Sequence, residues 1–201
     1  MTEIARELAR TALKINAIKL RPKDPFLWAS GFRMPIYNDN RMFLGDFEHR
    51  KLISQGFVEL IQSHNITPEV IAGTATAGIA PGTTLADVLK KPFIYVRSEA
   101  KGHGLQNQIE GILKPGQAVL MIEDLVSTGG SSISAIQAIR EANGTVDYCF
   151  SIFSYGMKKA LDQFAEARCS FSSILTYQVL LEEALSSNYV SVDEHKMLAD
   201  W

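Results

Sequence analysis

The fold of this chain is decided by one stretch of sequence, Val119-Leu120-Met121-Ile122-Glu123-Asp124-Leu125-Val126-Ser127-Thr128-Gly129-Gly130-Ser131-Ser132. An apolar run ends in two adjacent carboxylates, and a turn rich in glycine and hydroxyl groups leads into a helical pattern over 133–140. This order predicts a buried strand over 118–122, a tight loop, and a helix that begins at Ser132.

A loop of this kind in front of a helix can hold a phosphate group. The first N–H groups of a helix lack partners and form the positive end of its dipole. Gly129 and Gly130 let the backbone approach an anion closely, and Thr128, Ser131 and Ser132 offer hydroxyl donors. The two carboxylates would repel a bare phosphate, but they suit a ligand that also carries hydroxyl groups, such as a ribose. Packing alone also produces glycine-rich turns, so the glycines by themselves leave both interpretations open.

Composition and charge restrict the class of protein. The chain has 201 residues, 46% hydrophobic and 21% charged, which is ordinary for one globular domain. A net charge of -2 argues against binding to nucleic acid or to a membrane surface through bulk charge. The two cysteines have no metal-ligand spacing, and Cys149 lies in an apolar run, as a buried free thiol would. We therefore expect a cytoplasmic protein with no membrane span.

Apolar runs alternate with helical patterns along most of the chain. After a helix at the N-terminus and another over 47–63, the expected strands cover 70–72, 93–97, 118–122, 146–153 and 171–175. Helices are expected between them over 78–89, 132–141 and 158–166, with helical turns towards the C-terminus. This alternation predicts a parallel sheet whose ligand lies beyond the carboxyl ends of the strands.

Two further strand ends carry residues that suit anions. The segment Gly73-Thr74-Ala75-Thr76-Ala77-Gly78 has small side chains that permit close backbone approach to a second anion, although packing could also explain it. The long polar segment after the strand at 93–97 contains Arg97, Lys101 and His103, which can all meet phosphate oxygens. A solvated basic loop is the alternative interpretation of that segment.

The segment over 26–41 mixes aromatic, proline, glycine and polar residues, which predicts short strands and turns. Its aromatic residues could cover a flat heterocycle, or they could serve the core.

Together these motifs resemble the type I phosphoribosyltransferase family, whose members bind phosphoribosyl diphosphate (PRPP). Arg97, Lys101, His103 and Gly104 match the mobile catalytic loop of its orotate-specific members, and 30–41 is similar to their hood over the base. The resemblance implies an α/β fold with a central, mostly parallel sheet flanked by helices and an N-terminal hood. It also implies a single domain over 1–201, with the helix and hood region at 1–65, the PRPP-binding core at 66–180 and a C-terminal helical segment at 181–201.

The resemblance implies that the protein is an enzyme of pyrimidine biosynthesis. The reaction would join orotate to PRPP, giving orotidine 5′-monophosphate and pyrophosphate. The implied catalytic residues are Arg97, Lys101, His103 and Asp124. The implied PRPP-binding residues are Arg97, Lys101, His103, Glu123, Asp124, Leu125, Val126, Ser127, Thr128, Gly129, Gly130 and Ser131. The implied pyrophosphate loop is Thr74, Ala75, Thr76, Ala77 and Gly78, and the implied orotate contacts are Ser127, Tyr37 and Arg41.

The resemblance further implies Mg²⁺ held mainly by PRPP rather than by protein side chains, and a homodimer in which the loop lysine reaches the neighbouring subunit's site. Ala29, Ala77 and Ser98 stand where better-known members have lysines, and the arginine expected near 154–156 to grip orotate is absent. Arg41 and Arg33 could supply that charge. Transfer to another nucleobase and a PRPP-sensing regulator without catalysis are the alternatives, and the presence of Lys101 and His103 disfavours the regulator.

Overall fold

The computed structural model describes residues 2–27, 31, 33–98 and 108–201. Within it the chain forms two compact units. One unit joins Met1–Leu52 to Leu175–Trp201, and the other is Ile53–Ile174.

The unit Ile53–Ile174 is built on a six-stranded sheet with the order β10-β9-β8-β5-β6-β7. Its strands are β5 (Val70–Thr74), β6 (Phe93–Val96), β7 (Ile109–Glu110), β8 (Ala118–Val126), β9 (Thr145–Ser154) and β10 (Ser170–Thr176). β5 pairs in parallel with both β6 and β8, and β8 pairs in parallel with β9, whereas β6 and β7 are antiparallel. The predicted central, mostly parallel sheet is confirmed.

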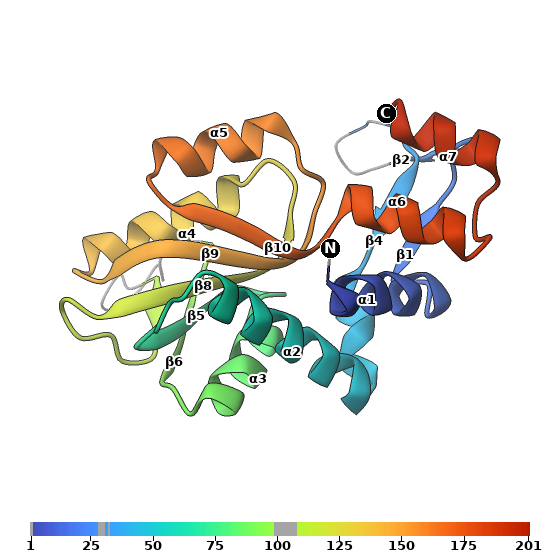
Figure 1. The fold of residues 1–201 in the computed structure, drawn as a ribbon. Helices are drawn as coiled ribbons and strands as arrows, with labels where there is room; N and C mark the ends of the chain where they lie inside the picture. Colours follow the sequence, from blue (N-terminus) through green and yellow to red (C-terminus); the bar gives the residue numbers. More distant parts are fainter. Residues whose placement is uncertain (1, 28–30, 32, 99–107) are drawn as a thin grey trace. The chain divides into compact units, whose positions relative to one another are not determined.

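Helices cover both faces of this sheet (Figure 1). α4 (Gly130–Glu141) and α5 (Lys158–Glu166) lie on one face, and α3 (Ile79–Leu89) lies on the other with α2 (Phe47–Ser63). The core between sheet and helices is apolar, because strands buried on both faces need apolar side chains on both. Its fully buried residues include Ile94, Met121 and Ile136.

Three details at the strand ends differ from the sequence-based expectation. β8 continues to Val126 rather than ending at Ile122, because it stays paired with β9 as far as Val126 and Ser154. The acid pair therefore lies within the strand. α4 begins at Gly130, two residues before the expected Ser132. The polar segment after β6 contains a further strand that is not among the expected ones, because Ile109–Glu110 forms β7 against β6.

The other unit contains the two ends of the chain. Its elements are α1 (Glu3–Lys14), β1 (Ile18–Leu20), β2 (Phe26–Leu27), β3 (Arg33–Met34), β4 (Ile36–Asn38), the 3-10 helix η1 (Asn40–Gly45), α6 (Tyr177–Ser186) and α7 (Val192–Ala199). β1 pairs with β4 and β2 pairs with β3, both antiparallel. The expectation of short strands and turns over 26–41 is confirmed.

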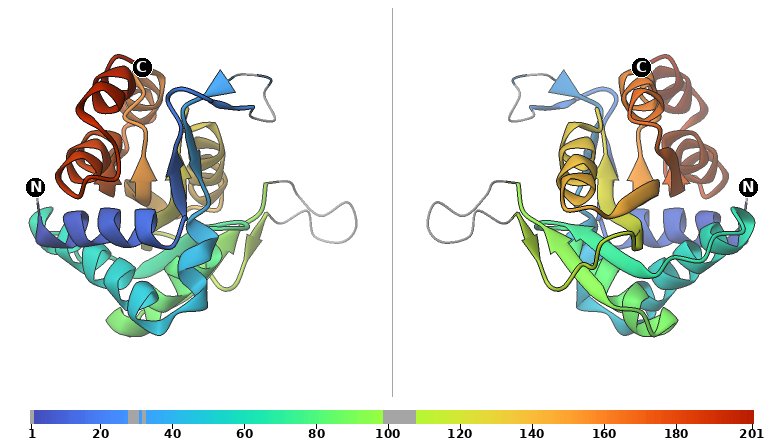
Figure 2. Two further views of the ribbon diagram at one scale, coloured as in Figure 1. Left: turned by 90° about the vertical axis from the view of Figure 1, so that its right-hand side faces the viewer. Right: turned by 90° about the vertical axis from the view of Figure 1, so that its left-hand side faces the viewer.

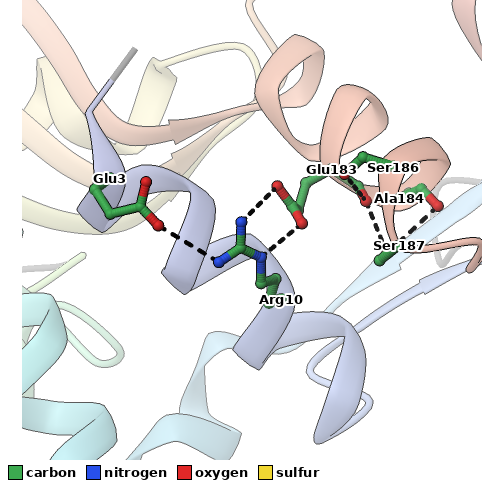
Figure 3. Close-up of polar contacts among 6 residues, drawn as sticks. All are labelled: Glu3, Arg10, Glu183, Ala184, Ser186 and Ser187. Atoms are coloured by element: carbon green, nitrogen blue, oxygen red, sulfur yellow. Dashed lines mark hydrogen bonds and ion pairs between the residues drawn. The ribbon is translucent and has the colours of Figure 1, made fainter.

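An ion-paired arginine joins the first helix to the sixth (Figure 3). Arg10 on α1 donates from Nε to Glu183 Oε1 at 2.7 Å and from Nη2 to Glu183 Oε2 at 3.4 Å. The Glu183 side chain is only 5% exposed, so this contact satisfies a buried carboxylate. Glu3 lies 3.4 Å from the same guanidinium. The two helices are thus held together by a bidentate pair as well as by apolar packing.

None of the helices in the described part of the chain has both the length and the apolar character needed to cross a membrane. Both cysteines, Cys149 and Cys169, are buried free thiols. Burial raises the pKa of Cys149 well above its usual value and that of Cys169 to about 12, so neither is a reactive thiolate.

Candidate active site

The acid pair in β8 is divided between two environments. The Glu123 side chain is buried, and Asp124 is half-buried. Glu123 Oε1 accepts a hydrogen bond from the backbone N–H of Asp124 at 3.0 Å, and Oε2 accepts one from Ser132 Oγ at 3.1 Å. Ser132 is in the first turn of α4 and is itself buried. The Glu123 carboxylate therefore connects the end of the strand to the start of the helix.

Burial changes the charge of this carboxylate. It raises the pKa of Glu123 to about 7, with the side chain of Asp124 adding to the rise, while the nearby hydroxyl of Thr74 and the hydrogen bond from the Asp124 backbone oppose it. At neutral pH the acid pair consequently carries less than two full negative charges. That reduction lessens its repulsion of an anion held at the adjacent turn.

The turn between β8 and α4 is open towards solvent on the side that faces away from the core. Gly129, the N-cap of α4, has a φ of +87°, a left-handed conformation that glycine adopts without strain. A side chain on Gly129 would lie 3.4 Å from the Phe164 ring, whereas one on Gly130 would meet nothing within 4 Å. Thr128, Gly130 and Ser131 are exposed. The helix thus presents its unpaired N–H groups to an accessible space, as an anion site requires.

The second loop, Thr74–Gly78, packs directly against β8. A side chain on Gly78 would lie 2.7 Å from the carbonyl oxygen of Ile122, and one on Gly73 would lie 2.5 Å from the carbonyl oxygen of Gly78. Thr74 Oγ1 donates to that same Ile122 carbonyl at 3.1 Å. Only glycine permits these approaches, so Gly73 and Gly78 are required by the packing of the loop.

The same loop is joined to β6 on its other side. The N–H of Ala75 donates to the carbonyl oxygen of Val96 at 2.8 Å, and the peptide bond between Ala75 and Thr76 is cis. Thr76 is exposed. The loop is therefore braced between the strand that carries the acid pair and the strand that ends directly before Arg97.

Arg97 lies at the end of β6, at the base of a hairpin. Its N–H donates to the carbonyl oxygen of Gln108 at 2.9 Å, directly after the pairing of Val96 with Ile109. Arg97 Nη1 lies 3.6 Å from Glu110 Oε1. Because β8, β5 and β6 are adjacent and parallel, the acid pair, the Thr74–Gly78 loop and Arg97 all lie at the carboxyl edge of one sheet.

Comparison with known proteins identifies the family. The model of the phosphoribosyl transferase domain matches residues 48–170. An orotate phosphoribosyltransferase of Cytophaga hutchinsonii is 45% identical over 196 residues, covering 98% of this chain and 94% of that protein. One from Streptococcus sanguinis is 48% identical over 188 residues, covering 94% and 90%. The chain belongs to the orotate phosphoribosyltransferase family. The predictions of the family, of its fold and of a pentosyl-transferring enzyme are confirmed.

A solved structure agrees with this assignment. The crystal structure of orotate phosphoribosyltransferase from Aeropyrum pernix matches with a TM-score of 0.79 and 29% identity, covering 92% of this chain and 99% of that one. The similarity therefore extends well beyond the segment that the domain model matches.

The residues predicted for an orotate phosphoribosyltransferase site fall into three groups. The PRPP cradle over 123–131, the pyrophosphate loop over 74–78 and Arg97 lie in the unit Ile53–Ile174, as described above. Lys101 and His103 lie outside the described residues. Tyr37 and Arg41 belong to the other unit.

Arg41 has a carboxylate partner in its own segment. Its Nε donates to Asp39 Oδ1 at 2.6 Å and its Nη2 to Asp39 Oδ2 at 2.9 Å. This pairing lowers the pKa of Asp39. The Arg41 side chain is 67% exposed. Tyr37 is also exposed, and its ring centroid lies 5.8 Å from that of Phe26. Arg41 thus already grips a carboxylate in the geometry that a carboxylate-bearing base would need.

Two residues have positions that the sequence did not indicate. Ser132 was expected to offer its hydroxyl to phosphate, but the hydroxyl is buried and donates to Glu123. Glu110, absent from the predicted site, faces Arg97. A pairing of Arg97 with Glu110 could have been predicted only by assigning a strand to Ile109–Glu110, and two residues are too short for a pattern.

Proposed function

We propose that this chain transfers the 5-phosphoribosyl group from PRPP to orotate, releasing pyrophosphate and giving orotidine 5′-monophosphate for pyrimidine biosynthesis. The observation that carries the proposal is the acid pair Glu123-Asp124 near the end of β8, followed by the turn that leads into the exposed N-terminus of α4. A phosphate on a hydroxyl-bearing sugar needs both features within a few ångströms of each other, because the helix binds the phosphate and carboxylate oxygens accept from the hydroxyls.

In this mechanism the bond between the anomeric carbon and the diphosphate oxygen breaks as the ring nitrogen of orotate attacks. Positive charge develops on the ribose ring and negative charge on the departing diphosphate. Asp124, the more accessible acid, accepts from the ribose hydroxyls and stabilises the cationic ring. Glu123 lies behind it, within the strand, and adds negative charge from there when it is ionised. The N–H groups and hydroxyls over 128–131 hold the 5′-phosphate and so fix the position of the anomeric carbon.

The leaving diphosphate is received by the neighbouring strand ends. The backbone of Thr74–Gly78 lies between β8 and β6. Its N–H groups at Ala75 and Gly78 bond within the protein, so those of Thr76 and Ala77 are the ones proposed to donate to a diphosphate oxygen. The guanidinium of Arg97 neutralises the charge that develops there. Lys101 and His103 have the same task in the proposal, as a cation and as a proton donor respectively, on the resemblance of their segment to the catalytic loop of the family.

Mg²⁺ is part of the proposal. Among the described residues, no group of three or more His, Cys, Asp or Glu side chains could hold a metal ion. The half-buried carboxylate of Asp124 is an oxygen ligand of the kind that Mg²⁺ prefers, and the diphosphate and ribose oxygens would complete its coordination. When bound, the ion neutralises charge on the diphosphate.

A homodimer and a cytoplasmic location complete the proposal. In the unit that contains the N-terminus, Met42, Leu44 and Phe47 are 45%, 41% and 64% exposed within six residues of sequence. A group of large exposed apolar side chains favours burial against another chain, for which we propose a second copy. Two buried free cysteines are typical of a protein kept in a reducing compartment.

The test is the loss of orotate absorbance when the purified protein is mixed with orotate, PRPP and Mg²⁺. We expect consumption of orotate in proportion to enzyme and release of an equal amount of pyrophosphate. Turnover of another nucleobase without consumption of orotate would reject the substrate. PRPP binding with no turnover of any base would instead favour a regulator.

A further inference from the structure

The hairpin of β6 and β7 forms one edge of the sheet (Figure 2). It carries two opposite charges, those of Arg97 and Glu110. Tyr95 of β6 pairs with Glu110 of β7, so Arg97, two residues further along, is diagonal to Glu110 on the same face. The distance of 3.6 Å between Arg97 Nη1 and Glu110 Oε1 follows from this register. The pairing is thus set by the backbone of the hairpin.

The backbone also keeps Glu110 in place. Gly111 follows it with a φ of +109°, and a side chain there would lie 2.9 Å from Ile94 Cγ2 and 3.1 Å from the carbonyl oxygen of Phe93. The chain is therefore pressed against β6 immediately after Glu110. Glu110 can turn its side chain, but its Cα cannot move away from Arg97 without disrupting the hairpin.

The ion pair between Arg97 and Glu110 is weak enough for another anion to take the place of Glu110. The side chains of Arg97 and Glu110 are 39% and 28% exposed, and an ion pair so open to solvent changes an equilibrium constant by up to about fivefold. A diphosphate carries several negative charges and can bind a guanidinium through two oxygens at once, so it competes successfully with one carboxylate.

We propose that Glu110 is the counter-ion of Arg97 in the free site. Pyrophosphate must displace Glu110 from Arg97 when it binds, and Glu110 pairs with Arg97 again when pyrophosphate leaves. Glu110 thereby lowers the affinity of the site for the diphosphate group and favours release of this product. The inference rests on the proposed role of Arg97 as a pyrophosphate ligand. Glu110 would then set the affinity of the enzyme for pyrophosphate without changing its affinity for the base.

The experiment measures pyrophosphate binding by calorimetry, with Mg²⁺ present, in a double-mutant cycle of Glu110→Gln and Arg97→Ala. Glu110→Gln should tighten the dissociation constant of pyrophosphate by about two- to fivefold, the range expected for an exposed pair. In the Arg97→Ala background the same substitution should have no effect. The matched control is Asp162→Asn, which removes one negative charge from the same unit and breaks the exposed pair Lys158–Asp162, at 2.7 Å. It should leave pyrophosphate binding unchanged.

The outcomes separate this inference from the proposed function. Unchanged pyrophosphate affinity in Glu110→Gln, with weakened binding in Arg97→Ala, would overturn the inference and keep Arg97 as a ligand. Equal tightening by Glu110→Gln with and without Arg97 would also overturn it, because the effect would be general charge repulsion. An Arg97→Ala enzyme that binds pyrophosphate normally would remove the proposed role of Arg97 and the inference together.

Discussion

The carboxylate of Glu123 accepts a hydrogen bond from the hydroxyl of Ser132 at 3.1 Å, and both side chains are buried. One residue belongs to β8 and the other to the first turn of α4, nine positions later. The contact fixes where the helix begins relative to the strand that carries Asp124. The geometry of the proposed phosphate cradle therefore depends on a buried polar contact between strand and helix.

Ser132→Ala should destabilise the protein, whereas Ser131→Ala should weaken PRPP binding. Removing the Ser132 hydroxyl leaves a buried Glu123 oxygen without its donor, at a cost of about 1–3 kcal/mol in the free energy of unfolding. Ser131 is exposed, so its loss should leave stability unchanged and raise the KM for PRPP by about fivefold, the equivalent of one hydrogen bond. Urea unfolding and steady-state kinetics of both variants measure this. The opposite pattern would show that Ser132, not Ser131, faces the phosphate.

The stability of the free enzyme should fall as pH rises towards 7, and Glu123→Gln should remove this dependence. The pKa of Glu123 is raised from 4.5 to about 7 by burial, so across that range the folded protein holds a proton that the unfolded chain has released. Unfolding then releases a proton, and the free energy of unfolding decreases with pH by at most about 1.4 kcal/mol per unit. Above about pH 7 Glu123 is ionised in both states, so the free energy of unfolding is lowered by the full cost of burying its charge and falls no further through this group.

The measurement compares urea unfolding of wild type and Glu123→Gln between about pH 5 and pH 8. Other titrating groups are common to both proteins, so the difference between the two curves isolates Glu123. Parallel curves would mean that Glu123 has the same pKa in the folded and unfolded states.

Gly73→Ala should disrupt the neighbouring loop over 74–78, which we propose to bind pyrophosphate. The added methyl group would lie 2.5 Å from the carbonyl oxygen of Gly78, so the loop or β5 must shift, at a cost of about 1–3 kcal/mol in stability. Gly45→Ala is the control, because a side chain there meets nothing within 4 Å. We expect a lower urea midpoint and weaker pyrophosphate binding for Gly73→Ala alone. Equal stability of the two variants would contradict the tight packing of this loop.

Mixed dimers test the role of Lys101. Lys101→Ala and Asp124→Asn should each slow turnover greatly, Lys101→Ala with PRPP binding still measurable, because we propose that both residues stabilise charge in the transition state. If Lys101 serves the neighbouring subunit's site, mixing the two inactive variants should restore activity, since one site of each mixed dimer then has both residues. The measurement compares the activity of the mixture with the activities of the two separate variants. A mixture as inactive as its parts would contradict the arrangement across subunits.

The buried elements of the fold could be predicted because their signal is local. Apolar runs and helical spacing predicted strands β5, β6, β8 and β9 and the helices between them to within a few residues. The end of β8 was placed four residues too early, because Glu123 and Asp124 are polar. A carboxylate can stay inside a strand when a distant residue satisfies it, and Ser132 is that residue here. Local pattern contains no information about such a partner.

The site could be predicted as a set of residues, but not as a set of contacts. The cradle, the loop over 74–78 and Arg97 can be recognised from the sequence, because their glycines, hydroxyl groups and charges are visible there. The partners of Arg97 and Arg41 were missed, because each depends on a register or a turn that the sequence does not specify.

Arg41→Ala and Arg33→Ala distinguish the two candidates for binding the carboxylate of orotate. Arg41 holds Asp39 through two hydrogen bonds of 2.6 and 2.9 Å, which shows that its guanidinium is oriented for a carboxylate. If orotate takes the place of Asp39, Arg41→Ala should raise the KM for orotate by about tenfold or more and leave that for PRPP nearly unchanged, since a charge-assisted contact is worth about 1.5–3 kcal/mol. Asp39→Asn should lower the KM for orotate, because it weakens the competitor. Steady-state kinetics with each substrate varied in turn would decide, and a larger effect of Arg33→Ala on the KM for orotate would transfer the role to Arg33.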